Sequence, residues 1–451
     1  MDKELNNKAL RYHEEYRPGK TGIIPTKPHR TLEELSLAYT PGVAAPAIEI
    51  MKDRWKAYRY TNKGNLVAVI SNGSAVLGMG NIGALASKPI MEGKAMLFKI
   101  YADIDAFDIE LNDEEPDIFV ATVQSLAPTF GAINLEDIKS PECFYIEEKL
   151  KGLLGVPVMH DDQHGTAVTV AAALLNACEV SGKEIDKVRI VICGAGAAGI
   201  STARMLPIIG VKKQNITMVD SKGVINLKRK GLDHLKMEFA SNCNAMTLHE
   251  AMVGCDVFIG LSRGNLLNDD DVMSMAEKPI IFTLANPIAE IEYEHAKSLR
   301  PDAIIATGRS DIPNQINNVL AFPYLFRGAL DTLSTCINED MKIAAVHAIA
   351  RIAHERAPRD IEEKYGRELT LDNEYLLPKP GDSRLLTEVS TAVAKAAIKS
   401  GVARRKIASF NEYIQTLLSR VDNDYSFGGD KIRHRSYIRH QRNKKDNEYK
   451  P

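Results

Sequence analysis

The sequence has no two cysteines in a C-x-x-C arrangement, and its six cysteines are scattered, mostly within apolar runs. This excludes a zinc knuckle or a disulfide framework and is typical of reduced thiols in a cytoplasmic protein. The opening MDKELNNKAL has no apolar stretch of the kind found in signal peptides. The longest uncharged apolar run, 165–178, is too short to span a bilayer and predicts a buried helix. We therefore expect a cytoplasmic protein without a membrane segment.

The net charge is also close to zero: 57 basic and 59 acidic residues give a formal charge of −2. Such a balance argues against bulk electrostatic attraction to nucleic acid or to a membrane. The exception is a basic C-terminal tail, which we place at 404–451 and whose last twenty-one residues, from Lys431, carry few acids. A solvated tail is the simpler interpretation. The alternative is a docking arm for an acidic partner or RNA.

Short β-branched runs alternate with helical spacers, which predicts an α/β fold. In the second half, the alternation predicts a doubly wound parallel sheet with strands at 188–193, 216–220, 256–261, 279–286 and 303–307. In the first half, it predicts strands at 66–70, 105–111, 131–135 and 156–160. Asn72-Gly73 predicts a hairpin between 66–70 and 74–78. We expect one domain at 1–163 and a Rossmann-type domain at 164–403.

The pattern G-x-G-x-x-G occurs twice, at 78–83 and at 194–199. The second copy follows a β-branched strand and opens a helix, so Gly194, Gly196 and Gly199 suit a dinucleotide pyrophosphate at a helix N-terminus. The first copy follows a predicted hairpin strand, and Pro89 is expected to break the helix that should open there. We therefore assign the dinucleotide to the second turn. The first is interpreted as a wall of the site or as a plain tight turn.

Asp220 ends the next predicted strand, where an acid hydrogen-bonds the adenosine ribose. A carboxylate at this position repels a 2′-phosphate, which favours NAD over NADP. Lys222 and Arg204 are near enough in sequence to leave NADP open as the alternative.

Two predicted strand ends in the first domain carry paired acids, Glu136-Asp137 and Asp161-Asp162. The carboxyl ends of parallel strands share one edge of a sheet, so the pairs are expected to converge. Clustered carboxylates need a cation, and ligands that are all oxygen suit Mg²⁺ or Mn²⁺. The alternative is that each pair caps a helix.

Two further residues and one motif could take part in the chemistry, but each also has an ordinary structural explanation. Lys94 opens an apolar helix, where a nearby divalent cation would depress its pKa and make it a base. Tyr39 precedes a Thr-Pro-Gly turn and, taken alone, is a packing residue. HDDQH at 160–164 invites a zinc interpretation, but Asp replaces the Glu of H-E-x-x-H and a glycine follows at once.

Seven stretches in order along the chain resemble a malic enzyme of the short bacterial type: SLAYTPGVAAP, NGSAVLGMGNIGALASKPIMEGKAMLFK, INLEDI, HDDQHGTA, VICGAGAAG, LANP and INNVLAFP. The resemblance implies oxidative decarboxylation of L-malate to pyruvate and CO₂ with NAD or NADP and Mg²⁺ or Mn²⁺. It also implies a homo-oligomer, a dimer first of all, in which a catalytic residue can come from the neighbouring subunit. Malolactic conversion of malate to lactate is a related alternative, and a silent nucleotide-binding regulator acting through the basic tail is a distant one.

Residue by residue, the resemblance makes Tyr39 the general acid and Lys94 the general base. The implied metal ligands are Glu136, Asp137 and Asp162, supported by Asp161. The implied substrate contacts are Lys94, Asn286, Asn317 and Asn318. The implied cofactor contacts are Gly78, Gly80, Gly83, Asp162, Gly194, Ala195, Gly196, Ala197, Ala198, Gly199, Asp220 and Asn286. In this scheme, the first glycine turn lines the cofactor cleft opposite the second.

Overall fold

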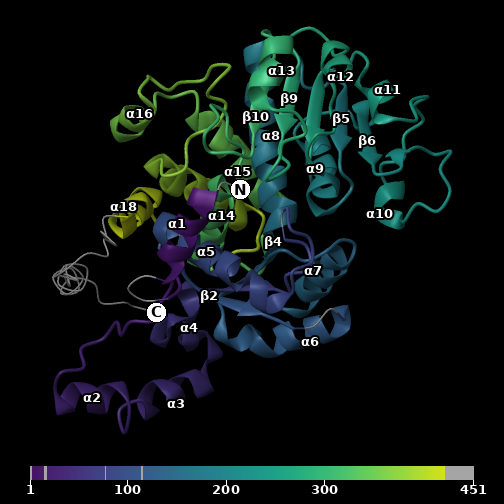
Figure 1. Ribbon diagram of the computed structural model, residues 1–451. Coiled ribbons are helices and arrows are strands. Elements are labelled where there is room, and N and C mark those ends of the chain that lie inside the picture. The colour runs from purple at the N-terminus through teal and green to yellow at the C-terminus, as the bar shows by residue number, and fades with distance from the viewer. Residues whose placement is uncertain (1–2, 15–17, 77, 113–114, 422–451) are drawn as a thin grey trace.

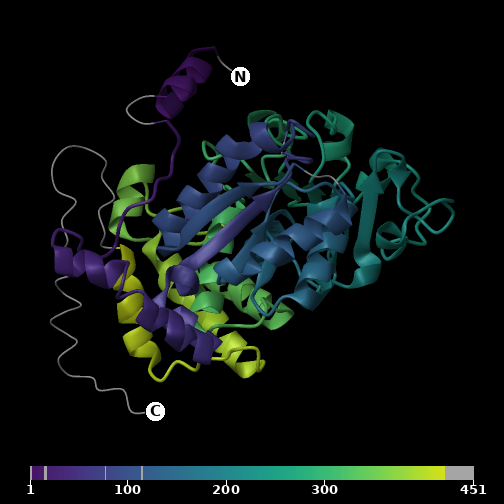
Figure 2. The same ribbon diagram turned by 90° about the horizontal axis from the view of Figure 1, so that it is seen from below.

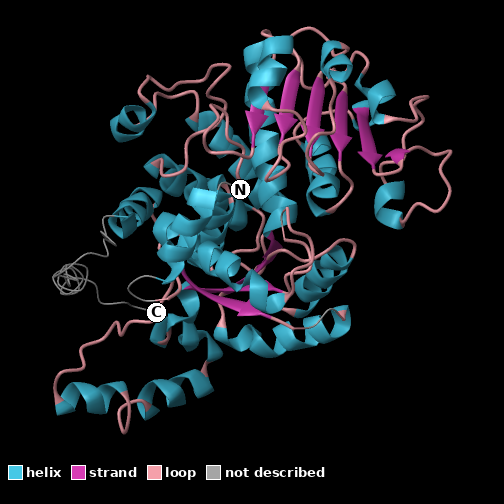
Figure 3. Cartoon of the chain, in the orientation of Figure 1, coloured by secondary structure: helices cyan, strands magenta, loops and turns pink. Residues whose placement is uncertain are grey.

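The computed structural model describes residues 3–14, 18–76, 78–112 and 115–421. It shows two mainly parallel sheets joined by a long helix (Figure 1). The first sheet has the strand order β2-β1-β3-β4 and the second has the order β10-β9-β8-β5-β6-β7. In Figure 3 the two sheets appear as separate magenta groups with helices around each. The predicted α/β fold with a doubly wound second sheet is confirmed.

The first sheet is built from the four strands predicted for the first half, and all its pairings are parallel. Its strands are β1 (Leu66–Ser71), β2 (Asp105–Glu110), β3 (Ala132–Leu135) and β4 (Val158–His160). The helices between them are α5 (Ala84–Ala102), α6 (Pro116–Leu126) and α7 (Glu142–Leu153). Because β1 pairs with β2 on one side and β3 on the other, all six of its residues are buried.

Two local predictions in this region are wrong. Asn72-Gly73 makes a turn, but it leads into a glycine loop instead of a hairpin, because both edges of β1 are already paired with parallel strands. Pro89 lies inside α5 without breaking it. The missing N–H of Pro89 deprives only the carbonyl of Leu85 of its helical partner, and Leu85 is 85% exposed, so water can replace it.

The second sheet is parallel except for a short antiparallel edge strand, β7. Its strands are β5 (Ile190–Cys193), β6 (Ile216–Asp220), β7 (Gly223–Val224), β8 (Val257–Gly260), β9 (Ile280–Thr283) and β10 (Ile304–Thr307). Its helices are α9 (Ala197–Ile208), α10 (His234–Met237), α11 (Leu248–Met252), α12 (Asp269–Met273) and α13 (Tyr293–Leu299).

The helix α8 (Asp161–Ser181) leaves the first sheet and packs against α9 of the second domain. It contains the predicted buried helix and is apolar on nearly every face, which suits a helix enclosed by other elements. It also packs on α15 (Glu339–Ile352). The remaining helices of the C-terminal half are α14 (Phe322–Asp331), α16 (Arg359–Tyr365), α17 (Ser390–Lys399) and α18 (Phe410–Val421). One continuous apolar core therefore connects both sheets.

The N-terminal helices lie apart from this core. They are α1 (Lys3–Glu14), α2 (Leu32–Ala38), α3 (Ala44–Lys52) and α4 (Ala57–Tyr60). Helices α2 and α3 project from the body as an arm, and none of their residues is buried (Figures 1 and 2).

Of the predicted C-terminal tail, residues 404–421 are described. Tyr413 of α18 donates a hydrogen bond to Asp331, and Arg420 pairs with Asp103 beside α5. The basic stretch from Lys431 lies outside the described residues. In the described part of the chain, no helix is both long and apolar enough to cross a membrane. All six cysteines are free, as predicted.

Candidate active site

The paired acids converge at the carboxyl edge of the first sheet. Glu136 and Asp137 follow β3, while Asp161 and Asp162 form the first turn of α8, directly after β4. Lys94 reaches them from α5, with Nζ 2.8 Å from Oε1 of Glu136 and in contact with the carboxylate of Asp161. The predicted convergence of the two pairs is therefore observed, and Lys94, which the resemblance assigns to the same site, lies with them.

The capping alternative for these acids is excluded. No helix starts at Glu136-Asp137, because the next one, α7, begins at Glu142 after Pro141. The first turn of α8 has no side-chain cap, and Asp162 instead accepts a hydrogen bond of 2.8 Å from the backbone N–H of Asp137. Their carboxylates thus point into a shared site.

Two local features hold the cluster together. Asp137 adopts φ +53°, which turns the chain sharply after β3. Gly165 leaves room for Asp161, since a Cβ at position 165 would lie 1.9 Å from Oδ1 of Asp161. The glycine that follows HDDQH is therefore required by the carboxylate one turn earlier.

Burial and mutual repulsion raise the carboxyl pKa values. Burial, with Asp162 and Glu136 nearby, raises the pKa of Asp137 to about 9. Burial raises that of Asp161 to about 8, although Lys94 opposes the shift. Burial alone lowers the pKa of Lys94, but Asp161 and Glu136 outweigh it and the net shift is upward. The depressed pKa expected for Lys94 referred to a site that holds a cation.

The donor set fits a hard divalent cation. It consists of carboxylate oxygens, which suit Mg²⁺ or Mn²⁺. Oδ1 of Asp161 is buried and has no hydrogen-bond partner. Among the described residues, however, no three His, Cys, Asp or Glu side chains are already grouped as metal ligands, and Lys94 is the cation that contacts Glu136 and Asp161.

The zinc interpretation of HDDQH has no support. His160 ends β4 and precedes α8, so it does not share a helix face with His164. His164 instead contacts Glu147 and Lys342.

The second glycine turn has the geometry of a pyrophosphate site. A Cβ at Gly194 would lie 2.5 Å from the carbonyl of Leu261, and one at Gly199 would lie 1.9 Å from the carbonyl of Gly194. A Cβ at Gly196 would meet open space. Gly196 is the N-cap of α9 and makes no side-chain cap, so N–H groups at the helix start remain for an anion. Ala195, Ala197 and Ala198 lie in the same turn and are half-buried.

The first glycine turn touches the second domain. A Cβ at Gly78 would lie 2.7 Å from the carbonyl oxygen of Asn286 and 2.7 Å from Pro287. Gly80 and Gly83 face open space, and all three glycines have positive φ. This contact supports the interpretation of the loop as a wall between the two domains.

The predicted amide residues come from the second domain. Asn318, in the segment after β10, donates a 2.5 Å hydrogen bond to Asp161 and so joins the two halves of the site. The side chain of Asn317 caps its own short helical turn by accepting from Val319 N–H. Asn286 is half-buried after β9, next to Gly78.

Asp220 ends β6 as predicted, but it is not a free carboxylate. Arg229 binds it through two nitrogens at 2.8 and 3.0 Å, and Lys236 lies 3.2 Å away. Burial raises the pKa of Asp220, yet Arg229, Lys222 N–H and Lys236 outweigh it and lower the pKa to about 2.

Tyr39 is not among the predicted site residues that meet around Lys94. It is the C-cap of α2 on the arm and is 75% exposed, whereas Lys94 is buried against Glu136 and Asp161. Within one chain, α2 lies well apart from α5, the helix that carries Lys94 (Figure 1).

Sequence reasoning missed several contacts. Lys94 Nζ lies 4.1 Å from the ring centroid of Phe322, and Asn134 donates to Glu136 at 2.9 Å. The polar Asn134 inside an apolar strand was a readable signal, whereas Phe322 gave none because it belongs to an apolar run.

The fold and the site define a dinucleotide-binding α/β protein whose first domain presents a lysine and four carboxylates beside the cofactor domain. Residues 18–151 match the family described as malic enzyme, N-terminal domain, and residues 163–363 match malic enzyme, NAD binding domain. The chain belongs to the malic enzyme family.

Named relatives support this membership. The chain is 54% identical over 93% of its length to the NADP-dependent malic enzyme of Escherichia coli, of which it spans 56%. It is 51% identical over 88% of its length to that of Halomonas elongata, of which it covers 94%. A crystal structure of malic enzyme from Pyrococcus horikoshii is 40% identical with a TM-score of 0.85, covering 98% of this chain and 100% of that one.

Proposed function

We propose that the protein oxidises and decarboxylates L-malate to pyruvate and CO₂, with a nicotinamide dinucleotide as hydride acceptor and Mg²⁺ or Mn²⁺ as the metal. The observation that carries this proposal is the buried contact of Lys94 with Glu136 and Asp161 beside the dinucleotide domain. A divalent cation held by these carboxylates would replace Lys94 as their positive partner and lower the pKa of Lys94, which would let the lysine accept a proton.

The residues divide the chemistry between two atoms of the substrate. A divalent cation would be held by Glu136, Asp137 and Asp162 and would polarise the substrate hydroxyl and carbonyl oxygens. Lys94 takes the proton from the C2 hydroxyl as C2 loses its hydride. Loss of CO₂ then leaves an enolate, and Tyr39 donates a proton to C3. Base and acid are separate because one proton leaves the C2 hydroxyl oxygen and the other is added at C3.

The amides of the second domain place the substrate against this pair. Asn318 already donates to Asp161, which positions its side chain at the carboxylates. Asn286 follows β9, and Asn317 follows β10 in the same segment as Asn318. Both would bind the malate carboxylates. The N–H groups at the start of α9 would bind the dinucleotide pyrophosphate.

We propose NADP as the preferred cofactor, although Asp220 alone favours NAD. Arg229 and Lys236 both pair with Asp220, and Lys236 also lies 3.9 Å from Asp233. A 2′-phosphate would replace Asp220 as the partner of one of these cations.

We also propose that a second copy of the chain completes the site with Tyr39. The arm that carries Tyr39 exposes six large apolar side chains to solvent, namely Leu32, Leu35, Leu37, Val43, Ile48 and Met51. An exposed set of this kind marks a protein interface. In a two-fold dimer, each arm would reach the partner's Lys94.

The test is the absorbance of reduced nicotinamide in the full-length protein with L-malate and Mn²⁺, using NADP and NAD in parallel. We expect malate-dependent, metal-dependent reduction with pyruvate as the product. Lactate with no net reduced cofactor would replace this proposal with malolactic conversion. Folded protein that binds NADP but turns malate into neither product would contradict both.

A further inference from the structure

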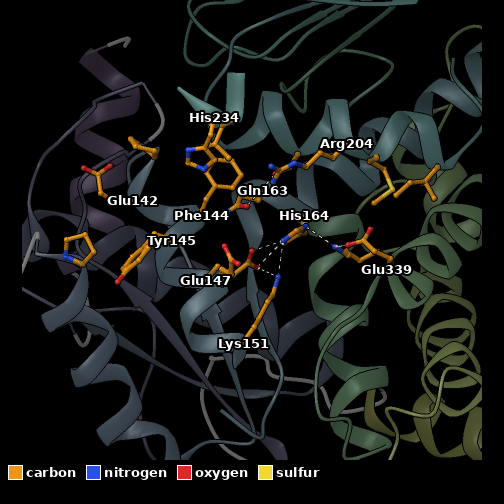
Figure 4. A pocket seen from close by; sticks show the side chains of 18 of the residues that line it. Glu142, Phe144, Tyr145, Glu147, Lys151, Gln163, His164, Arg204, His234 and Glu339 are labelled. Carbon is orange, nitrogen blue, oxygen red and sulfur yellow. Dashed lines mark hydrogen bonds and ion pairs between the residues drawn. The ribbon is translucent and has the colours of Figure 1, made fainter. Parts of the chain in front are cut away.

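A cavity of about 890 Å³ lies behind the first turn of α8 (Figure 4). Gln163 and His164 line this cavity, whereas Asp161 and Asp162, directly before them, contact Lys94 and Asp137. The first turn of α8 therefore has a catalytic side and a cavity side. Residues that fix this turn from the cavity side therefore also fix where the carboxylates of Asp161 and Asp162 point.

Glu147 of α7 makes the contacts on the cavity side. Its Oε1 accepts a hydrogen bond of 2.9 Å from the backbone N–H of His160, the residue before the acid pair. Its carboxylate also lies 3.0 Å from Nε2 of His164, two residues after the pair. Glu147 thus contacts one residue on each side of Asp161-Asp162 along the chain.

Neighbouring groups fix the charge states of this bridge. Lys342 Nζ lies 3.2 Å from Nδ1 of His164, so Nδ1 accepts and Nε2–H donates to Glu147. Burial opposes ionisation of Glu147, but His164 and Lys151 outweigh it and hold its pKa well below the usual range. Lys151 lies 2.8 Å from the carboxylate.

The packing of α7 does not depend on Glu147. Cys143, Ile146 and Leu150 of the same helix are buried in the apolar cluster under the first sheet. Glu147 is only 5% exposed, and its carboxylate contacts His160, His164 and Lys151. Two of these three partners, His160 and His164, belong to the β4–α8 junction and not to α7. A buried carboxylate is costly to desolvate unless such partners compensate it.

We propose that Glu147 is a positioning residue for the metal site: it holds the β4–α8 junction so that Asp161 and Asp162 face Lys94 and Asp137. Groups that orient metal ligands are needed for full metal affinity, and their loss typically weakens binding roughly ten- to a hundredfold. This inference rests on the proposed metal-dependent function.

The experiment measures Mn²⁺ binding from the electron paramagnetic resonance signal of free Mn²⁺, with full-length protein and NADP present. Glu147→Ala is expected to raise the Mn²⁺ dissociation constant roughly tenfold or more. Glu147→Gln keeps an oxygen that can accept from His160 N–H, so it is expected to recover most of the affinity. The dissociation constant for NADP, followed by fluorescence, should stay within about twofold of wild type in both.

Glu148→Ala is the matched control, because Glu148 is the next residue of α7 and is exposed. It should bind Mn²⁺ like wild type. If Glu147→Ala does not fold, His164→Ala removes one half of the bridge and is expected to weaken Mn²⁺ binding several-fold.

Two results separate the possible failures. Folded Glu147→Ala or His164→Ala that binds Mn²⁺ within twofold of wild type would overturn the positioning role and leave the proposed function intact. Wild-type protein that binds no Mn²⁺ would overturn both.

Discussion

Nζ of Lys94 lies 2.8 Å from Oε1 of Glu136, although the two residues are 42 positions apart in the chain. The contact joins α5 to the end of β3, on either side of the sheet edge where ligands of parallel sheets bind. Lys94 is thereby the positive charge that offsets the crowded carboxylates. A metal cation bound by the same carboxylates would compete with Lys94 as their positive partner.

Replacing Lys94 with methionine should therefore separate catalysis from metal binding. We expect Lys94→Met to lower kcat by roughly a hundred- to ten-thousandfold, the usual contribution of a general base. Its Mn²⁺ affinity should stay the same or rise, because a competing positive charge is removed. Lys99→Met is the control, since Lys99 lies on α5 but pairs with Asp103 and Asp105. A Lys94→Met enzyme with near-normal kcat would exclude the lysine as the base.

Gly165 offers a test of the geometry of Asp161. A Cβ at position 165 would lie 1.9 Å from Oδ1 of Asp161, so Gly165→Ala must displace that carboxylate. We expect a fall in kcat/KM of roughly a hundredfold or more, since a displacement of about 1 Å can cost that much.

Gly152→Ala is the matched control for this change. Gly152 lies in α7 with nothing within 4 Å of its Cβ position, so alanine should raise the unfolding free energy by roughly 0.5–1 kcal/mol. Activity of Gly152→Ala should equal wild type. Full activity of Gly165→Ala would show that Asp161 does not need its present position.

The sequence predicts those features that depend on local pattern. Strand positions, the buried helix within α8 and the glycine turn before α9 all have periodicity or spacing that can be read directly. The convergence of Glu136 with Asp161 followed from one rule about parallel strands. The hairpin at Asn72-Gly73 was wrong because the pairing of β1 is decided by β2 and β3, which are distant in sequence.

Ion pairs between residues that are distant in the sequence could not be predicted from local patterns. Asp220 was interpreted as a bare carboxylate because Arg229 and Lys236 are nine and sixteen residues further on, beyond any local pattern. The bridge made by Glu147 was equally hidden, since a Glu on a helix usually faces solvent. Tyr39 was identified by its motif alone, and neither sequence nor the single chain brings it to Lys94.

Cofactor preference should follow the cations around Asp220. We expect Arg229→Gln and Lys236→Gln each to lower kcat/KM for NADP roughly ten- to a hundredfold, the worth of one hydrogen bond to a charged group, and to change that for NAD much less. Lys230→Gln is the control, because Lys230 is exposed in the same loop. Steady-state kinetics with both cofactors gives the ratio of kcat/KM for NADP to kcat/KM for NAD. An unchanged ratio in both variants would show that the 2′-position is read elsewhere.

Glu290 should make stability depend on pH. It is fully buried after β9, accepts from Ala285 N–H at 3.2 Å, and leaves Oε1 without a partner. Burial raises its pKa to about 7, above the value near 4.3 of an unfolded chain. Because the pKa is raised in the folded state, the contribution of Glu290 to the free energy of unfolding is fully present below about pH 4.3. This contribution is lost as the pH rises through about 7.

Glu290→Gln stays neutral and should escape this loss. Its unfolding free energy relative to wild type should increase by roughly 2–3 kcal/mol between about pH 5 and about pH 8.5. Denaturant unfolding at both pH values measures this, with the exposed Glu294→Gln as control. A difference that does not vary with pH would mean that Glu290 is ionised throughout.

Mixed dimers can show whether Tyr39 acts across subunits. Tyr39→Phe and Lys94→Ala are each expected to be nearly inactive alone. In a dimer that exchanges subunits, one of each kind would form one site with both native residues and one site with neither. Random mixing makes about half of the dimers mixed, so activity should return to roughly one quarter of wild type. A mixture that stays inactive after subunit exchange, shown by a labelled chain, would place Tyr39 in the site of its own subunit. The arm formed by α2 and α3 would then have to fold back onto Lys94 instead of reaching a partner.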